Sequence, residues 1–85
     1  MDAYVTFKNK LDEIHTWPSP YLFKFVIPSA KKGELLSLMP TGMVQERSSS
    51  NEKYVSISLT AQMDNSDEVV AVYKQVSKIE GIVTL

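Results

Sequence analysis

The 85-residue sequence has no cysteine, a single histidine and no long apolar run. The lack of cysteine excludes disulfides, iron–sulfur clusters, thiolate zinc sites and thiol nucleophiles. His15 has no second imidazole with which to hold a metal ion, so neither a metal nor a cofactor is expected. No segment approaches the ~20 apolar residues of a transmembrane helix, and the charged start of the chain is unlike a signal peptide. We therefore expect a cytoplasmic protein with no membrane association.

The sequence also lacks an excess of charge of either sign, because nine basic residues face ten acidic ones for a net charge of −1. This balance argues against nucleic-acid binding, which needs a basic face. The contents of 44% hydrophobic and 22% charged residues are ordinary for a globular protein, and the length predicts a single domain over residues 1–85. So short a chain buries only about 60–65% of its unfolded surface, so it holds one modest core.

The first segment, residues 1–16, predicts an N-terminal helix. Its apolar residues recur at helical spacing and would share one face: Tyr4, Phe7, Leu11 and Ile14. The run "TWPSP" ends this helix, because proline cannot donate to the helix ladder and restricts the residue before it. Residues 17–20 therefore predict a stiff proline-rich corner. Our hypothesis is that Trp17, Pro18, Pro20 and Tyr21 hold this corner and position the first helix.

Residues 21–85 predict four strands and two helices. Side chains alternate in "YLFKFVI" (21–27) and "KYVSISLTAQ" (53–62), which is typical of strands. Residues 43–49 predict a polar edge strand, and 82–85 a short last strand. A helix over 30–39 would be capped by Ser29, and another would begin at Asn65 with Glu68 in the capping-box position.

This order, βαββαβ, predicts an α+β protein with the ferredoxin-like two-layer sandwich, preceded by the extra N-terminal helix. The right-handed crossover rule gives an antiparallel sheet of order 4-1-3-2. Strands 21–27 and 53–62 would then be central, and one sheet face would remain without helices.

Three patches resemble the YbeD-like family of small bacterial proteins, which has an ACT-like, ferredoxin-like fold and no known function. The first is "LDEIHTWPSPYLFK", with Trp17, Pro18, Pro20, Tyr21 and Lys24. The second is "RSSSNEKYVSIS", and its matching residues are Arg47, Ser49, Ser50, Tyr54, Ser56 and Ser58. The third is the C-terminal segment with Tyr73, Lys78, Ile79 and Leu85. The resemblance implies a regulatory domain, because ACT-like domains bind small molecules, often amino acids, between paired domains.

The candidate interaction residues divide between a turn and a sheet face. Ser49 and Ser50 could hold an anion with Arg47, although a polar hairpin turn is the favoured explanation for them. Lys24, Tyr54 and Ser56 would share the sheet face without sandwich helices, together with Ser58 and Thr60. That face could stack RNA, but one tyrosine and one lysine are a poor set for it. Cover by the N-terminal helix or by a second subunit is the alternative.

The sequence thus favours a regulatory or protein-interaction module that is not an enzyme and has no catalytic residues. Its partner would be a second copy, through the sheet face or edge strand 43–49, or an unknown protein. The alternative is an amino-acid or carboxylate sensor using the Pro28–Gly33 loop. An acylphosphatase-like enzyme ranks last, because the only arginine, Arg47, lies in a predicted edge strand.

Overall fold

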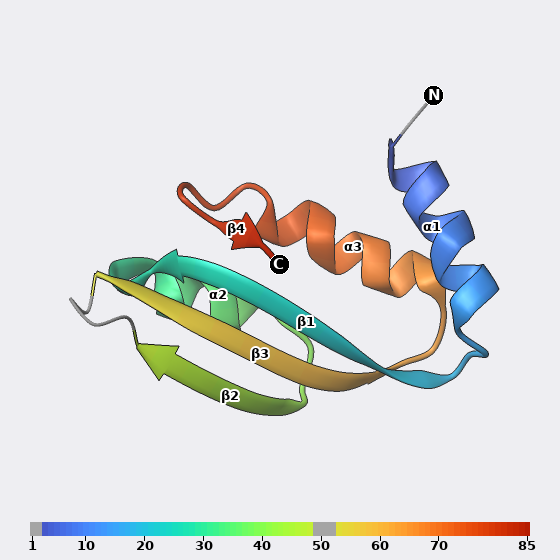
Figure 1. The fold of residues 1–85 in the computed structure, drawn as a ribbon, viewed down its shortest axis with the longest axis horizontal. Helices are drawn as coiled ribbons and strands as arrows, with labels where there is room; N and C mark the ends of the chain where they lie inside the picture. Colours follow the sequence, from blue (N-terminus) through green and yellow to red (C-terminus); the bar gives the residue numbers. More distant parts are fainter. Residues whose placement is uncertain (1–2, 49–52) are drawn as a thin grey trace.

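The computed structural model describes residues 3–48 and 53–85 and shows an α+β protein with one four-stranded antiparallel sheet and three α-helices. Figure 1 shows the elements in chain order. They are α1 (Ala3–Ile14), β1 (Ser19–Pro28), the 3-10 turn η1 (Ser29–Lys31), α2 (Lys32–Leu38), β2 (Met43–Ser48), β3 (Tyr54–Met63), α3 (Ser66–Val76) and β4 (Val83–Thr84).

The sheet has the order β2-β3-β1-β4, so the two strands with the clearest alternation lie inside it. β1 and β3 pair along ten residues each, from Ser19 opposite Met63 to Pro28 opposite Tyr54. β4 adds only two pairs, at Phe25 and Val26 of β1. The long central ladder therefore carries the sheet, and β2 and β4 are its edges.

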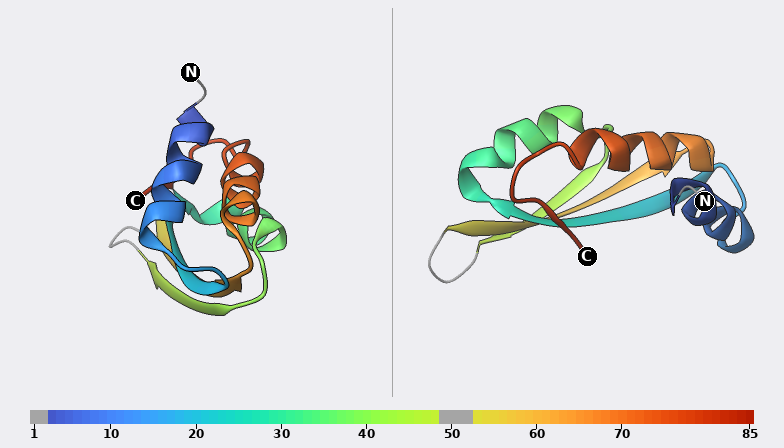
Figure 2. Two further views of the ribbon diagram at one scale, coloured as in Figure 1. Left: turned by 90° about the vertical axis from the view of Figure 1, so that its right-hand side faces the viewer. Right: turned by 90° about the horizontal axis from the view of Figure 1, so that it is seen from above.

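The core lies between the sheet and helices α2 and α3, which share one face of it (Figure 2). Alternation sends every second side chain of β1 and β3 to this covered face. The fully buried members include Phe23, Phe25, Ile27 and Ile57, joined by Leu35 of α2 and by Val69 and Val76 of α3. The alternation in the sequence predicted this core face correctly.

Helix α3 begins as its cap residues predict. The Asn65 side chain accepts a hydrogen bond from the Glu68 backbone N–H at 2.9 Å. The Glu68 carboxylate reaches back and accepts from the Asp64 N–H at 3.0 Å, one residue earlier than in the standard capping box. These bonds satisfy backbone donors that have no partner inside the helix.

Helix α2 differs from its prediction. The expected helix over 30–39 is divided into η1 and the seven-residue α2, and no side chain caps either of them, so the Ser29 cap was wrong. Gly33 lies in the first turn of α2, where glycine lowers helix propensity. Leu35 is the buried residue that holds α2 to the core.

The N-terminal helix does not cover the helix-free sheet face, so that part of the expectation was wrong. α1 packs beside α3, where the Phe7 and Tyr73 rings meet edge to face with centroids 5.2 Å apart. Lys74 of α3 also lies 5.1 Å from the ring centroid of Tyr4. Leu22, in the middle of β1, stays half exposed on the opposite side of the sheet. An aromatic partner on α3 thus decides where α1 docks.

The corner between α1 and β1 is shorter than predicted. β1 begins at Ser19, so Pro20 belongs to the strand and pairs with Gln62, and residues 17–20 are not a separate corner. The Trp17–Pro18 peptide is cis. β4 pairs with β1 only at Phe25 and Val26, so the side of β1 away from β3 has no partner strand at Pro20 in the described sheet. Proline has no backbone N–H to donate and is tolerated at such an unpaired edge.

Candidate functional site

The sheet face opposite the helices, which we name the open face, is formed by alternate residues of the strands. The register places Lys24, Ser58 and Gln45 in one cross-strand row. Ser56 and Arg47 lie in the next row. Its other members include Leu22, Val26, Met43, Tyr54, Thr60 and Val83. Three strands therefore bring polar groups together that lie far apart in the sequence.

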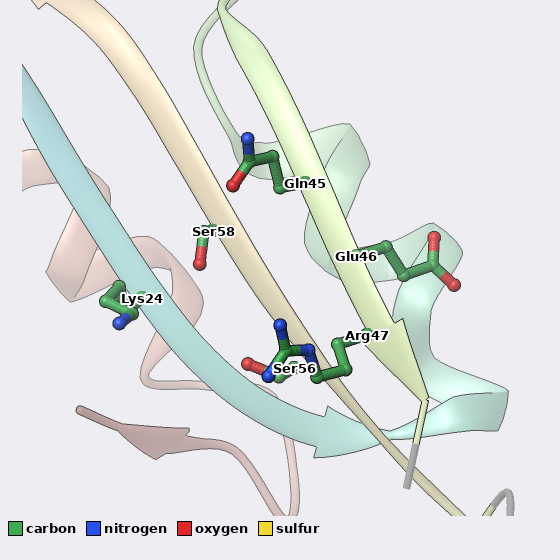
Figure 3. Close-up of a pocket in the computed structure, with 6 residues that line it drawn as sticks. All are labelled: Lys24, Gln45, Glu46, Arg47, Ser56 and Ser58. Atoms are coloured by element: carbon green, nitrogen blue, oxygen red, sulfur yellow. The ribbon is translucent and has the colours of Figure 1, made fainter.

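The open face contains a depression of about 540 Å³, the polar hollow, between β1 and β2. Its lining residues are Lys24, Gln45, Glu46, Arg47, Ser56 and Ser58. Figure 3 shows the Arg47 guanidinium next to Ser56, and Lys24 on the far side of β3. The Glu46 carboxylate points away from both. The hollow therefore presents donors, and its one carboxylate is directed elsewhere.

The electrostatics of the hollow follow from where its ion pairs form. Glu46 is bound by Lys32 of α2, whose ammonium lies 3.0 Å and 3.2 Å from its two carboxylate oxygens. No ion pair among residues 3–48 and 53–85 includes Lys24 or Arg47. None of the paired strand residues that face the open side is acidic. A chain of net charge −1 thus carries a locally positive surface.

An apolar rim surrounds the polar hollow. Leu22 is 50% exposed, Met43 72%, Tyr54 47% and Val83 52%. Such side chains occur singly on most protein surfaces, but here they share one face with the two cations. Apolar side chains beside a few convergent polar groups are a feature of small-molecule sites, whereas protein–protein interfaces have an apolar centre and a polar rim.

The predicted corner residues form a structural group at the α1–β1 junction, separate from the hollow. The Trp17 indole donates to Asp12 Oδ1 at 2.9 Å, which ties the junction to the last turns of α1. The His15 ring lies between those of Trp17 and Tyr21, with centroids 5.1 Å and 5.5 Å away. These contacts support the hypothesis that Trp17 and Tyr21 position α1.

Two ionisable groups near the junction have shifted pKa values. A hydrogen bond from Ser66 and a second from Trp17 lower the pKa of Asp12 below its ordinary value of 3.8. Burial raises the pKa of Tyr73, and a hydrogen bond with Tyr21 raises it further. The two tyrosine oxygens lie 3.1 Å apart. Both shifts arise from contacts that join α1, β1 and α3.

A second depression, of about 450 Å³, lies between α1, α3 and the chain end. Aromatic rings line much of it, among them Tyr4, Phe7, Tyr21 and Tyr73. Its two central hydroxyls bond each other. It presents no charged side chain, so it is the weaker candidate for ligand recognition.

The structure brings together part of the predicted site. Lys24, Arg47 and Ser56 meet at the hollow, and Tyr54 shares their face. Ser49 and Ser50 lie outside the described residues. Sequence reasoning missed Gln45, although its spacing of two from Arg47 in a predicted strand was the signal for it.

No group of three potential metal ligands occurs among residues 3–48 and 53–85. Over the same ranges, no helix is long and apolar enough to cross a membrane.

The chain is thus a small α+β protein whose sheet has one face without helices, and the polar hollow lies on that face. A family model described as "Protein of unknown function (DUF493)" matches residues 12–85, and the chain belongs to this family. It is the same family as the YbeD-like family that the sequence motifs resemble. No curated protein and no solved structure matches the chain significantly.

Proposed function

We propose that this protein is a non-enzymatic, self-associating interaction module with a ferredoxin-like sandwich. Counted from β4, the strand order reads 4-1-3-2, and α2 and α3 lie on one face, which supports that classification. Arg47 lies within a strand and not in a loop that could wrap a phosphate, which weighs against the acylphosphatase reading. The amino-acid sensor reading at residues 28–33 loses support, because the helix that follows is only seven residues long.

The observation that carries the proposal is the state of β2. All six of its side chains are exposed, and its outer edge has no partner strand within the described sheet. An open edge presents backbone donors and acceptors that can pair with another strand. β2 contains no proline and no lysine, two residues that commonly protect such edges.

The charges along β2 favour β2 of a second copy of the chain as the strand that pairs with this edge. A two-fold axis through Gln45 would join the two sheets with their helices on the same side. It would place Val44 opposite Glu46, and Met43 opposite Arg47, of the second copy. No like charges meet in this register, and five residues of each strand take part. Moving the axis to Glu46 would set two carboxylates directly opposite each other, which is unfavourable.

Pairing through the open face is less favourable than pairing through the β2 edge. A two-fold axis normal to that face would bring the Lys24 and Arg47 side chains toward their own copies. The described part of the face has no acidic side chain to compensate them. Like charges brought together in this way raise the free energy of association. The open face therefore stays accessible to solvent when two copies pair through β2.

The test is sedimentation equilibrium of the wild-type protein and of two variants at one exposed position. Val44→Glu places a carboxylate opposite Glu46 of the second copy, whereas Val44→Lys places an ammonium there. Each cross-strand charge pair contributes about 0.2–1 kcal/mol and occurs twice, so Val44→Glu should weaken the dimer by about twofold to thirtyfold. Val44→Lys should keep or strengthen it. A wild-type monomer at several hundred micromolar would refute self-association, and equal effects of both variants would refute this register.

A further inference from the structure

We propose that the polar hollow binds a small organic molecule that carries two negative charges on carboxylate or phosphate oxygens. The proposal concerns the open face and does not depend on pairing through the β2 edge. It rests on the juxtaposition of Lys24 and Arg47 across β3, with hydroxyl groups between them.

The sheet sets the separation of the two cations. Lys24 and Arg47 lie on the strands either side of β3, in adjacent rows of the register. A strand spacing of ~4.8 Å and a two-residue rise of ~6.7 Å put their Cα atoms about 12 Å apart. Two long side chains across such a gap can converge on one ligand from opposite sides. A ligand with two anionic groups would meet one cation at each end.

The chemistry of the lining suits oxyanions. The Arg47 guanidinium can bind a carboxylate or phosphate through two parallel hydrogen bonds. Lys24 adds a compact positive charge, and the hydroxyls of Ser56 and Ser58 are donors on the floor between them. Ser56 and Ser58 are half-buried, so a bound anion would be partly withdrawn from water. Partial withdrawal strengthens each of these contacts.

The size and border of the hollow favour an organic ligand over inorganic phosphate. About 540 Å³ falls within the range of small-molecule sites, which is ~300–1,000 Å³. Leu22 lies one row beyond Lys24 and Tyr54 one row beyond Ser56, so apolar side chains flank the lining at both ends. A nucleic-acid strand is a poorer fit, because Tyr54 is the one aromatic side chain among the described open-face residues.

The experiment is an NMR titration of the full chain, following backbone amide shifts of Ser56 and Ser58. The probes are succinate and O-phosphoserine, with acetate and an oligothymidylate as comparisons. We expect saturable shifts with succinate, with O-phosphoserine or with both, and weaker binding of acetate. The probe that saturates at lower concentration identifies the preferred oxyanion.

The variants Lys24→Gln and Arg47→Gln each remove one cation, and Lys78→Gln makes the same charge change at an exposed site outside the hollow. We expect at least tenfold weaker binding in the first two, because each loses a charge-assisted contact. Binding should stay unchanged in Lys78→Gln and in Val44→Glu. Three results would overturn the proposal. The first is no saturation up to about 10 mM of either dianion. The others are a loss of affinity in Lys78→Gln equal to that in Lys24→Gln and Arg47→Gln, and tighter binding of the oligothymidylate than of the dianions.

Discussion

The Tyr21–Tyr73 contact allows the packing of β1 against α3 to be tested with minimal change in shape. Its two hydroxyl oxygens lie 3.1 Å apart in a part-buried position. The substitutions Tyr21→Phe and Tyr73→Phe each remove one oxygen and keep the ring. Each single change leaves the other hydroxyl without its partner, whereas the double change removes both groups.

The expected cost of each single substitution is about 1 kcal/mol of unfolding free energy. Tyr21→Phe should cost more than Tyr73→Phe, because burial raises the pKa of Tyr73 and its unpartnered hydroxyl would be the less hydrated one. The double variant should cost less than the sum of the singles, by about 1 kcal/mol. For a chain of this size, 1 kcal/mol shifts Tm by about 4–8 °C.

The measurement is urea unfolding followed by far-ultraviolet circular dichroism for the four proteins of the cycle. A constant slope of free energy against urea concentration would show that the unfolded states are comparable. If the two single costs simply add in the double variant, the hydroxyls are not coupled. The hydrogen bond would then contribute nothing to the docking of α3 on β1.

Two further predictions concern pH and glycine. The lowered pKa of Asp12 contributes stability at neutral pH that is lost as pH falls through its folded-state pKa, below 3.8. Asp12→Asn should therefore reduce stability at pH 7 and flatten its decline in acid, as read from urea midpoints at several pH values; an unchanged decline would contradict this. Gly42→Ala should destabilise by about 1–3 kcal/mol, since its Cβ would collide with the Thr60 carbonyl oxygen. Gly33→Ala has open space in α2 and should stabilise by about 0.5–1 kcal/mol. Thermal melts check this pair, and shifts of the same sign would refute the reasoning.

Local patterns were enough to predict the elements that depend on neighbours in sequence. Phe23, Phe25 and Ile27 place large apolar side chains at every second position, so one face of β1 was recognisable before any partner was known. The Asn65 cap was predictable for the same reason, since its acceptor and the Glu68 donor are three residues apart. These interactions need no information about the rest of the fold.

The placement of α1 was not predictable, because it depends on a residue far along the chain. Its apolar stripe could have covered either the open face or α3, and the Tyr73 ring on α3 decides between them. The start of β1 was missed because proline is uncommon inside a strand that has partners on both sides. Pro20 pairs with Gln62 of β3, and its other side has no partner strand in the described sheet.

The site was predictable only in part. Lys24 and Ser56 could be assigned to one face because both lie in strongly alternating strands. Arg47 was linked instead to the serines after it, since the edge strand carries no apolar alternation that would show its orientation. Only the register with β3 reveals that Arg47 and Gln45 complete the hollow.

The full exposure of β2 has a consequence for how this family can diverge. A strand whose side chains all lie outside the core can accept substitutions at little cost to folding. Relatives could therefore exchange the six residues of Met43–Ser48 and acquire new binding preferences while they retain the same architecture. β1 and β3, by contrast, carry the core on one face and part of the hollow on the other, so a change in them can affect folding and recognition together.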